Sequence, residues 1–202
     1  MNISIYTGSI TRTGGGLFNA MQGLYLNPTF KDQSLTMFSY KDEKIHADLE
    51  SWKNQLKINL YQGRKFRFSR KIRNDILSSN TDILHVHGLW QYPHLFMETW
   101  KEKRLEPLVC SPHGMLDSYI LREQGWLKRL IGKTVFVNAT NAVDCFHALC
   151  LKELQDIRAY GIKKPIAVIP NGINLPNYIP HYEKKDNKLH LLYLGRLHKK
   201  KE

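Results

Sequence analysis

Residues 83–87 read Ile-Leu-His-Val-His and residues 108–111 read Leu-Val-Cys-Ser. Such short apolar runs are typical of buried strands, whereas Leu95–Arg104 between them has helical spacing. A strand, a helix and a second strand form the unit of a parallel sheet, because parallel neighbours need a long crossover connection. This stretch therefore predicts an α/β fold.

The same alternation extends through most of the chain. Strands are predicted at Ile3–Tyr6, Leu35–Phe38, Leu56–Tyr61, Ile83–His87, Leu108–Ser111, Cys145–Leu149 and Ile166–Ile169. Helices are predicted at Leu17–Leu26, Lys65–Leu77, Leu95–Arg104, Trp126–Val137 and Lys152–Tyr160, the last closed by Gly161. This order predicts a Rossmann-like parallel sheet with helices on both faces. Ligands of such sheets bind beyond the carboxyl ends of the strands.

The composition changes near the C-terminus. We expect residues 1–176 to form the Rossmann-like domain and to end after a turn at Pro170-Asn171-Gly172. Residues 177–188 have mixed charges and no periodicity, which indicates a linker. Leu189–Leu194 is a new apolar run, so residues 189–202 are predicted to begin a second domain.

Bulk composition narrows the class of protein. No run approaches the roughly 20 apolar residues that cross a bilayer, and the start has no signal-peptide pattern. The cysteines Cys110, Cys145 and Cys150 lie in or beside apolar stretches, which predicts buried, reduced thiols in the cytoplasm. The formal net charge of +12 implies an anionic partner, and nucleic acid, anionic lipid and phosphorylated substrate all stay open on charge alone.

Glycines follow the first predicted strand. Gly14, Gly15 and Gly16 precede a helix, where backbone amides can bind a diphosphate or sugar at close range. The spacing is not that of a dinucleotide fingerprint. A flexible loop without a ligand is the alternative interpretation.

Histidines follow two later strands. His85 and His87 share a face because strand side chains alternate, and His113 follows the next strand. A metal site is one hypothesis, but only His113 comes from a comparable place, so we favour a polar cleft. His113 can donate to a hydroxyl or to an anionic oxygen, although a structural turn histidine is also compatible with the pattern.

A basic segment follows the last predicted strand. Arg196 and Lys201 lie just after Gly195, which suits capture of a diphosphate by charge-assisted hydrogen bonds. A solvated basic tail is an equally good interpretation of these residues alone.

Taken in order, these pieces resemble the family 4 glycosyltransferases of the GT-B fold, over nearly the whole chain. The matching pieces are Gly14–Gly16, His87-Gly88, the Ser111–Leu116 stretch, Phe146-His147-Ala148 with Glu153, Val168–Ile173 and Leu194–His198.

The resemblance implies a retaining transfer of a sugar from a nucleotide-sugar donor to a polysaccharide or lipid-linked acceptor, without metal or other cofactor. It implies that Gly14, Gly15 and Gly16 lie near the donor phosphates and that His113 is the catalytic residue beside the transferred sugar. His87 and Asn171 would complete the binding cleft. Arg196 and Lys201 would neutralise the leaving diphosphate, where fixed positive charge lowers the barrier.

The chain also departs from the family pattern. It stops at Glu202, before the paired glutamates of the donor-binding domain, and Leu149 and Cys150 replace the usual small hydroxyl residues. These departures predict that this polypeptide alone transfers little or no sugar. We expect a gene fragment, a frameshifted product or a half whose C-terminal partner is encoded separately.

One stretch between residues 63 and 73 is strongly basic. Its cations are Arg64, Lys65, Arg67, Arg70, Lys71 and Arg73, interleaved with apolar side chains. On a helix these residues predict a face for an anionic membrane, where each adds about 1 kcal/mol. The alternative is a core-facing Phe68–Ile72–Ile76 stripe with a solvated basic side. No nucleic-acid-binding motif accompanies the charge, so nucleic acid is disfavoured.

The leading hypothesis is a bacterial-type glycosyltransferase of surface polysaccharide or glycolipid assembly, in the cytoplasm at the inner face of the membrane. A non-catalytic module that binds an acceptor, a membrane or a partner chain is the second. A nucleotide-sugar 2-epimerase is the third, although few strand ends supply the carboxylates it needs. A metal hydrolase is the fourth.

Overall fold

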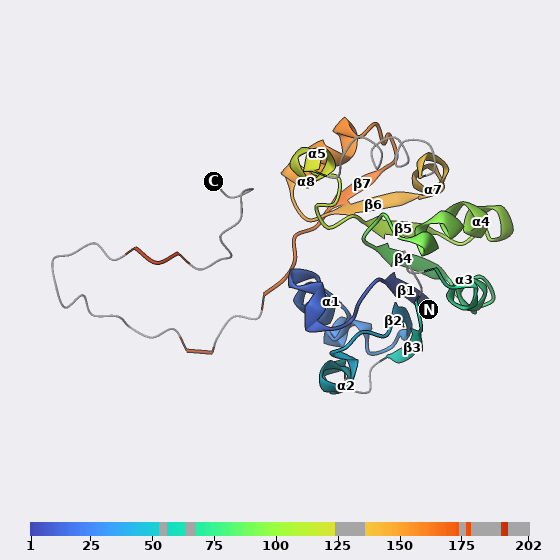
Figure 1. Cartoon of the computed structure of the whole chain (residues 1–202), viewed down its shortest axis with the longest axis horizontal. Helices are drawn as coiled ribbons and strands as arrows, with labels where there is room; N and C mark the ends of the chain where they lie inside the picture. Colours follow the sequence, from blue (N-terminus) through green and yellow to red (C-terminus); the bar gives the residue numbers. More distant parts are fainter. Residues whose placement is uncertain (53–55, 64–67, 124–135, 174–176, 179–190, 194–202) are drawn as a thin grey trace. The chain divides into compact units, whose positions relative to one another are not determined.

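The computed structural model describes residues 1–52, 56–63, 68–123, 136–173, 177–178 and 191–193. All of its strands join one parallel sheet in the order β3-β2-β1-β4-β5-β6-β7 (Figure 1). The strands are β1 (Asn2–Thr7), β2 (Ser34–Tyr40), β3 (Lys57–Tyr61), β4 (Ile83–His87), β5 (Leu108–Ser111), β6 (Cys145–Ala148) and β7 (Ile166–Val168). The predicted Rossmann-like α/β sheet is confirmed.

Helices cover both faces of this sheet. The α-helices are α1 (Gly16–Tyr25), α2 (Ile45–Asp48), α3 (Arg70–Leu77), α4 (Phe96–Lys103), α5 (Ser118–Glu123), α7 (Val137–Asn141) and α8 (Leu151–Ala159). The 3-10 helices are η1 (Arg12–Gly14), η2 (Pro28–Phe30), η3 (Leu49–Trp52) and η5 (Tyr92–Leu95). In Figure 1, α1 and α2 lie on one side of the strands, and α3 and α4 lie on the other.

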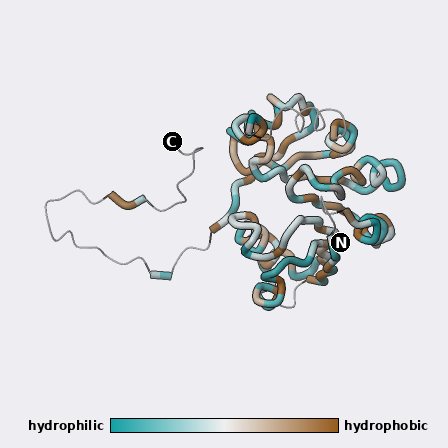
Figure 2. The backbone as a smooth tube through the Cα atoms, in the orientation of Figure 1, coloured by the Kyte–Doolittle hydropathy of each residue, from teal (hydrophilic) through white to brown (hydrophobic). Residues whose placement is uncertain are grey.

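Two apolar cores result from this layering. Ile5 and Tyr6 are neighbours on β1, yet Ile5 packs in the core beneath α1 and Tyr6 in the core beneath α3 and α4. Alternation of strand side chains accounts for the split, because successive residues point to opposite faces. Figure 2 shows hydrophilic and apolar stretches on the same helices, as expected of helices with one buried face.

The strand order reverses between β1 and β4. The chain builds outward from β1 to β3 and then returns to place β4 on the other side of β1. In an open parallel sheet, the crevice outside the carboxyl ends of such neighbours is the usual ligand site. We call this side of the sheet the carboxyl edge.

The basic stretch differs from its prediction. Helix α3 begins at Arg70, because Ser69 before it is extended, with φ −155° and ψ 113°. Ile72 and Ile76 are buried as predicted, but Phe68 precedes the helix and is 39% exposed. The predicted helical start at Lys65 is therefore wrong for residues 68–69, and residues 64–67 lie outside the described residues.

Other differences lie in connections and at the C-terminus. The short helices α2 and α5 were not predicted, and most of the helix predicted at Trp126–Val137 lies outside the described residues. Residues 170–172 form no hydrogen-bonded turn, contrary to the prediction. Residues 191–193 are not in a strand, and the rest of the strand predicted at Leu189–Leu194 lies outside the described residues. The sheet lies within a compact unit spanning Met1–Gly172, and the domain boundaries expected at 176 and 188 stay predictions.

The three cysteines have different exposures. Cys110 is buried, Cys145 is half-buried and Cys150 is exposed, all as free thiols. The prediction of buried thiols is therefore wrong for Cys150, which occupies the N-cap position of α8 outside the apolar strand β6. Among the described residues, no helix is long and apolar enough to span a bilayer.

Candidate functional site

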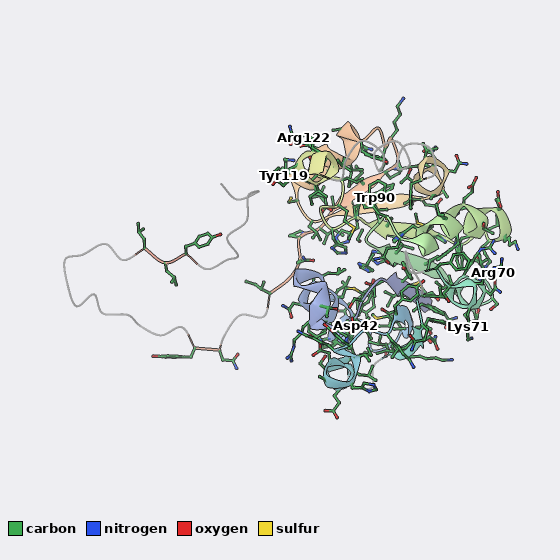
Figure 3. The ribbon with its side chains drawn as sticks, viewed as in Figure 1. Asp42, Arg70, Lys71, Trp90, Tyr119 and Arg122 are labelled. Carbon is green, nitrogen blue, oxygen red and sulfur yellow. The ribbon has the colours of Figure 1, made fainter. Side chains whose placement is uncertain are left out.

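One carboxylate ties the loop after β1 to the end of β2. Asp42 Oδ2 accepts hydrogen bonds of 2.8, 2.6 and 2.8 Å from the hydroxyls of Ser9, Thr11 and Thr13. Burial alone would raise the pKa of Asp42, but the hydrogen bonds outweigh it and lower the pKa below its ordinary value. Asp42, labelled in Figure 3, therefore holds the loop in one shape as an ionised group.

The carboxylate of Asp48 also holds the loop after β1. The backbone nitrogen of Arg12 donates to Asp48 Oδ2 at 2.8 Å, and Arg12 Nε lies 3.3 Å from Asp48 Oδ1. The Asp48 side chain is 1% exposed, while that of Arg12 is 71% exposed. The loop thus carries an anchored backbone and an accessible positive charge.

The loop ends in the three glycines. Gly15 caps α1 with φ 60° and ψ −131°, a conformation open to glycine, and no side chain caps the helix. A Cβ atom on Gly15 or Gly16 would meet no heavy atom within 4 Å. The backbone conformation therefore requires glycine at Gly15. The Gly15 amide donates to the Arg12 carbonyl at 3.0 Å and the Phe18 amide to the Gly15 carbonyl at 3.1 Å, which leaves the exposed Gly16 amide at the helix start for a ligand.

The loops after β4 and β5 interlock. Gly88 and Trp90 both have positive φ, of 84° and 67°. Met115 Sδ accepts from the backbone nitrogen of Leu89 at 3.0 Å, and the Met115 carbonyl accepts from Trp90 Nε1 at 3.2 Å. A Cβ on Gly88 would lie 3.1 Å from Met115 Cε, which would have to move slightly, and the φ of 84° itself favours glycine there.

A buried glutamate fixes the turn that carries His113. His113 has φ 54° and Gly114 has φ 74°, and the first value is uncommon for a residue with a side chain. Glu153 Oε1 accepts from the Gly114 nitrogen at 2.6 Å, and Oε2 accepts from the Leu149 nitrogen at 2.7 Å. Glu153 on α8 thus joins the loops after β5 and β6, and the joined loops over-determine the strained backbone of His113.

The β4 histidines share a face, as predicted, and both contact α1. The hydroxyl oxygen of Tyr25 lies 2.7 Å from His85 Nδ1 and 2.6 Å from His87 Nε2. The two imidazole centroids are 4.1 Å apart. Tyr25, in the last turn of α1, therefore holds both histidines at the end of β4 by hydrogen bonds.

Further polar contacts extend from these histidines across β5 and β6. His87 Nδ1 lies 2.8 Å from His113 Nε2, and His85 Nε2 lies 2.7 Å from Ser111 Oγ. On β6, His147 Nδ1 lies 2.9 Å from the same Ser111 oxygen. Both ring nitrogens of His85 and His87 thus have hydrogen-bond partners, and a metal ligand from this pair would have to break one of them.

Burial sets the charge of these groups. It lowers the pKa of His85 to about 3 and that of His113 to about 4, with smaller contributions from neighbouring imidazoles. Burial also lowers the pKa of His87 well below its ordinary value and raises that of the Tyr25 hydroxyl. Near pH 7 the site offers neutral imidazoles, which act through hydrogen bonds. In the described ranges, no three His, Cys, Asp or Glu side chains are grouped to hold a metal ion.

The carboxyl edge thus combines exposed helix amides, a strained histidine and a polar histidine cluster, in a chain with a parallel Rossmann-like sheet. The family model described as Glycosyltransferase Family 4 matches residues 39–176, more than half of the 202-residue chain. The chain belongs to glycosyltransferase family 4. The resemblance seen in the ordered sequence pieces is confirmed, and so is the general assignment to the glycosyltransferases.

Solved structures show the same fold for this family 4 chain. Anabaena Alr3699/HepE in complex with UDP-glucose matches with a TM-score of 0.63 and 13% identity, over 86% of this chain and 44% of that one. Its complex with UDP matches with a TM-score of 0.62 and 14% identity, over 86% and 45%. A Listeria monocytogenes protein provisionally assigned as a UDP-N-acetylglucosamine 2-epimerase matches with a TM-score of 0.53 and 16% identity, over 82% and 44%.

The family 4 chain spans less than half the length of each of these matched structures. Among curated protein sequences, none matches it significantly.

Several predicted site residues of the family 4 chain belong to the carboxyl edge. His87 ends β4, His113 follows β5, and Gly14–Gly16 lie between β1 and the start of α1. Asn171 is exposed after β7, and the neighbouring Gly172 carbonyl lies 3.9 Å from the Cβ position of Gly23, so this segment passes beside α1. Arg196 and Lys201 lie outside the described residues.

The predicted membrane-facing residues are only partly described. Arg70 and Lys71 are exposed on α3, where Figure 3 labels them, and Arg73 is half-buried. Lys71 Nζ is 2.8 Å from Asp75 Oδ2, so part of its charge is compensated. Arg64, Lys65 and Arg67 lie outside the described residues.

Three contributors to the site were missed from the sequence. Asp42 lies two residues after the end of β2, so the search for polar residues at strand ends that found His87 would also have found Asp42. Tyr25 lies within the helix predicted at Leu17–Leu26, and nothing local shows that its hydroxyl meets two histidines. Ser111 was noted only as part of a motif, although its hydroxyl joins β4 to β6.

Proposed function

We propose that this chain is the acceptor-side domain of a retaining glycosyltransferase that moves a sugar from a nucleotide-sugar donor to a polysaccharide or lipid-linked acceptor. The observation that carries the proposal is the common edge of Gly15 and His113. Gly15 follows β1 and His113 follows β5, with only β4 between these parallel strands. An anion-binding helix start and a sugar-contacting imidazole therefore belong to one side of one sheet.

The chemistry of sugar transfer suits this arrangement. The leaving nucleotide gains negative charge while the sugar gains oxocarbenium character, so groups that stabilise charge at the diphosphate lower the barrier. The exposed Gly16 amide at the start of α1 would bind the diphosphate beside Gly15, and Arg196 and Lys201 would supply fixed positive charge. The HepE complexes, which hold UDP-glucose and UDP, support a nucleotide-sugar donor. No metal or other cofactor enters the proposal.

His113 and its neighbours would contact the sugar. His113 is only partly buried, and its turn is held by Glu153 in a conformation that an unconstrained loop would leave. We assign it the catalytic position beside the transferred sugar, with His87 behind it and Asn171 at the margin.

The test uses the 202-residue chain with UDP-glucose as the probe. In amide-resolved NMR spectra, we expect the donor to shift the signals of Gly14–Gly16 and His113 at millimolar concentration. Gly16→Val should abolish the shifts without loss of stability, because the new side chain would occupy open space at the helix start. Gly172→Val, which also adds a side chain in open space, is the matched control. Shifts that avoid both segments would contradict the proposal.

Retention is tested by the product. With UDP-glucose and a bacterial lipid extract, a retaining enzyme forms an α-linked glucoside, because the donor is α-linked. A β-linked product would overturn the retaining assignment. Because this polypeptide alone is expected to transfer little or no sugar, donor binding without transfer would not by itself favour the non-catalytic binding module.

A second part of the proposal is that this acceptor-side domain binds a membrane surface. We propose that Arg67, Arg70 and Lys71 bind anionic lipid, consistent with assembly of a surface polysaccharide or glycolipid at the inner face of the membrane. The exposure of Arg70, Lys71 and Phe68 supports this proposal. Changing all three cations to Glu should weaken co-sedimentation with phosphatidylglycerol vesicles roughly 100-fold, at about 1 kcal/mol per residue. The control changes Lys31, Lys103 and Lys163 to Glu, and equal loss in both variants would reject a specific face.

A further inference from the structure

Six side chains and one carbonyl form a continuous path of hydrogen bonds at the carboxyl edge. In order of contact its members are His113, His87, Tyr25, His85, Ser111, His147 and the backbone carbonyl of Ile169. We call this set the histidine relay. It joins α1 to β4, β5 and β6 and to the segments that follow β5 and β7.

The carbonyl end determines the direction of the first bonds. A carbonyl oxygen only accepts, so His147 donates its Nε2 proton to the Ile169 oxygen at 2.8 Å. An imidazole with its single ring proton on Nε2 has a bare Nδ1, so the Ser111 hydroxyl donates to His147 Nδ1. Because a hydroxyl has one proton, Ser111 accepts from the Nε2–H of His85.

The direction of the hydrogen bonds is passed on through Tyr25. His85 carries its proton on Nε2, so its Nδ1 accepts the single proton of the Tyr25 hydroxyl. The Tyr25 oxygen therefore accepts from the Nε2–H of His87. The bare Nδ1 of His87 then accepts from His113, whose proton is consequently on Nε2. Every imidazole of the histidine relay has the same tautomer.

The groups in the middle of the histidine relay are neutral because they are buried. The low pKa values of His85 and His87 leave them neutral, and the raised pKa of Tyr25 keeps its one proton. His113 Nδ1 has no hydrogen-bond partner among the described residues. It is the one ring nitrogen of the relay left for a ligand.

We propose that Tyr25 is a positioning residue that transmits this proton order to His113, so that His113 Nδ1 accepts a hydrogen bond from its ligand. The ligand group must then carry a proton, and under the proposed function it is a sugar hydroxyl. Neutral His113 has no proton on Nδ1 to donate to a phosphate oxygen. This narrows the sequence-based expectation that His113 donates to a hydroxyl or to an anionic oxygen.

The first test reads the tautomers directly in the whole chain. Long-range ¹H–¹⁵N spectra of imidazoles distinguish protonated from bare nitrogens, and single His→Gln variants assign the signals. At pH 8, where imidazoles are neutral, we expect His85, His87, His113 and His147 all to carry the proton on Nε2. A proton on Nδ1 of His113 would overturn the proposal.

Two variants interrupt the relay at different places. Tyr25→Phe separates His87 and His113 from the carbonyl, so these two should show mixed tautomers while His85 and His147 keep theirs. Ser111→Ala interrupts it one step earlier, so His85 should also become mixed and only His147 should stay fixed. A purely structural role for Tyr25 would not separate the histidines in this way.

The control is Tyr160→Phe, because the Tyr160 hydroxyl is buried without a hydrogen-bond partner in the described part of the chain. It should leave all four tautomers unchanged. An unchanged His113 in Tyr25→Phe would refute the positioning role, and the wild-type spectrum decides the tautomer even if a variant fails to fold. Correct tautomers with no nucleotide-sugar binding would support the relay and count against the proposed function alone.

Discussion

Glu153 Oε1 lies 2.6 Å from the backbone nitrogen of Gly114, and the second oxygen of the same carboxylate accepts from Leu149. Glu153 is 5% exposed, and its carboxylate is shared by two loops at the carboxyl edge. An acceptor-only group is required there, because both partners are N–H donors. The His113 turn therefore depends on a charge located on α8.

Glu153→Gln should destabilise the chain by about 2 kcal/mol, because the amide NH₂ would face an N–H donor and leave it unpaired. Urea unfolding followed by circular dichroism measures the change. Glu102→Gln, at an exposed position, is the control and should change stability little. Equal stability of the two variants would show that the carboxylate does not hold these loops.

Gly88→Ala should cost about 1–2 kcal/mol, because an alanine would be forced into left-handed backbone with φ 84° and its methyl would press on Met115. Gly23→Ala is a matched change within helix α1, where alanine is expected to stabilise by about 0.5–1 kcal/mol. The opposite signs can be measured by thermal unfolding. If both variants were stabilised, the close packing of the loops after β4 and β5 would be wrong.

Asp42→Asn should loosen the glycine-rich loop. The amide offers one acceptor oxygen in place of a carboxylate that receives three hydroxyl bonds, so we expect a loss of about 1–2 kcal/mol. Hydrogen exchange of the amides of residues 11–16 should accelerate more than that of β1. Asp32→Asn removes an exposed carboxylate as the control, and equal exchange in both variants would contradict the anchoring role.

The buried histidines predict a loss of stability on mild acidification. Their pKa values in the folded chain are below the ordinary 6.5, at about 3 for His85 and about 4 for His94 and His113. The unfolded chain therefore takes up protons first, so the stability is present above pH 6.5 and is lost as the pH falls toward 4. Carboxylates such as Asp42 add their own loss mainly below about pH 4.

Urea midpoints at pH 7.5, 6.0 and 5.0 measure this effect. We expect the midpoint to fall over the series, and His46→Gln, at an exposed position, to follow the same course. A midpoint that stays constant from pH 7.5 to 5.0 would mean that the histidines are accessible to solvent in the folded chain.

Much of the fold could be predicted from the sequence, because strands and helices are indicated by residues that are neighbours along the chain. Buried parallel strands are short apolar runs, so Ile83–His87 and Leu108–Ser111 were predicted with the observed bounds. The alternation of strand side chains placed His85 and His87 on one face for the same reason. The start of α3 was less readable, since the basic run continues across Ser69, where the backbone is extended.

By itself, the sequence determined the α/β class, the family and the placement of Gly14–Gly16 and His113 in connections that follow strands, because each depends on neighbours along the chain. Only the tertiary structure decided which groups meet there. Tyr25 reaches His87 because β4 lies beside β1, and His113 takes its proton order from a carbonyl after β7. Hydrogen bonds between elements depend on strand order and packing, which no local pattern of residues encodes.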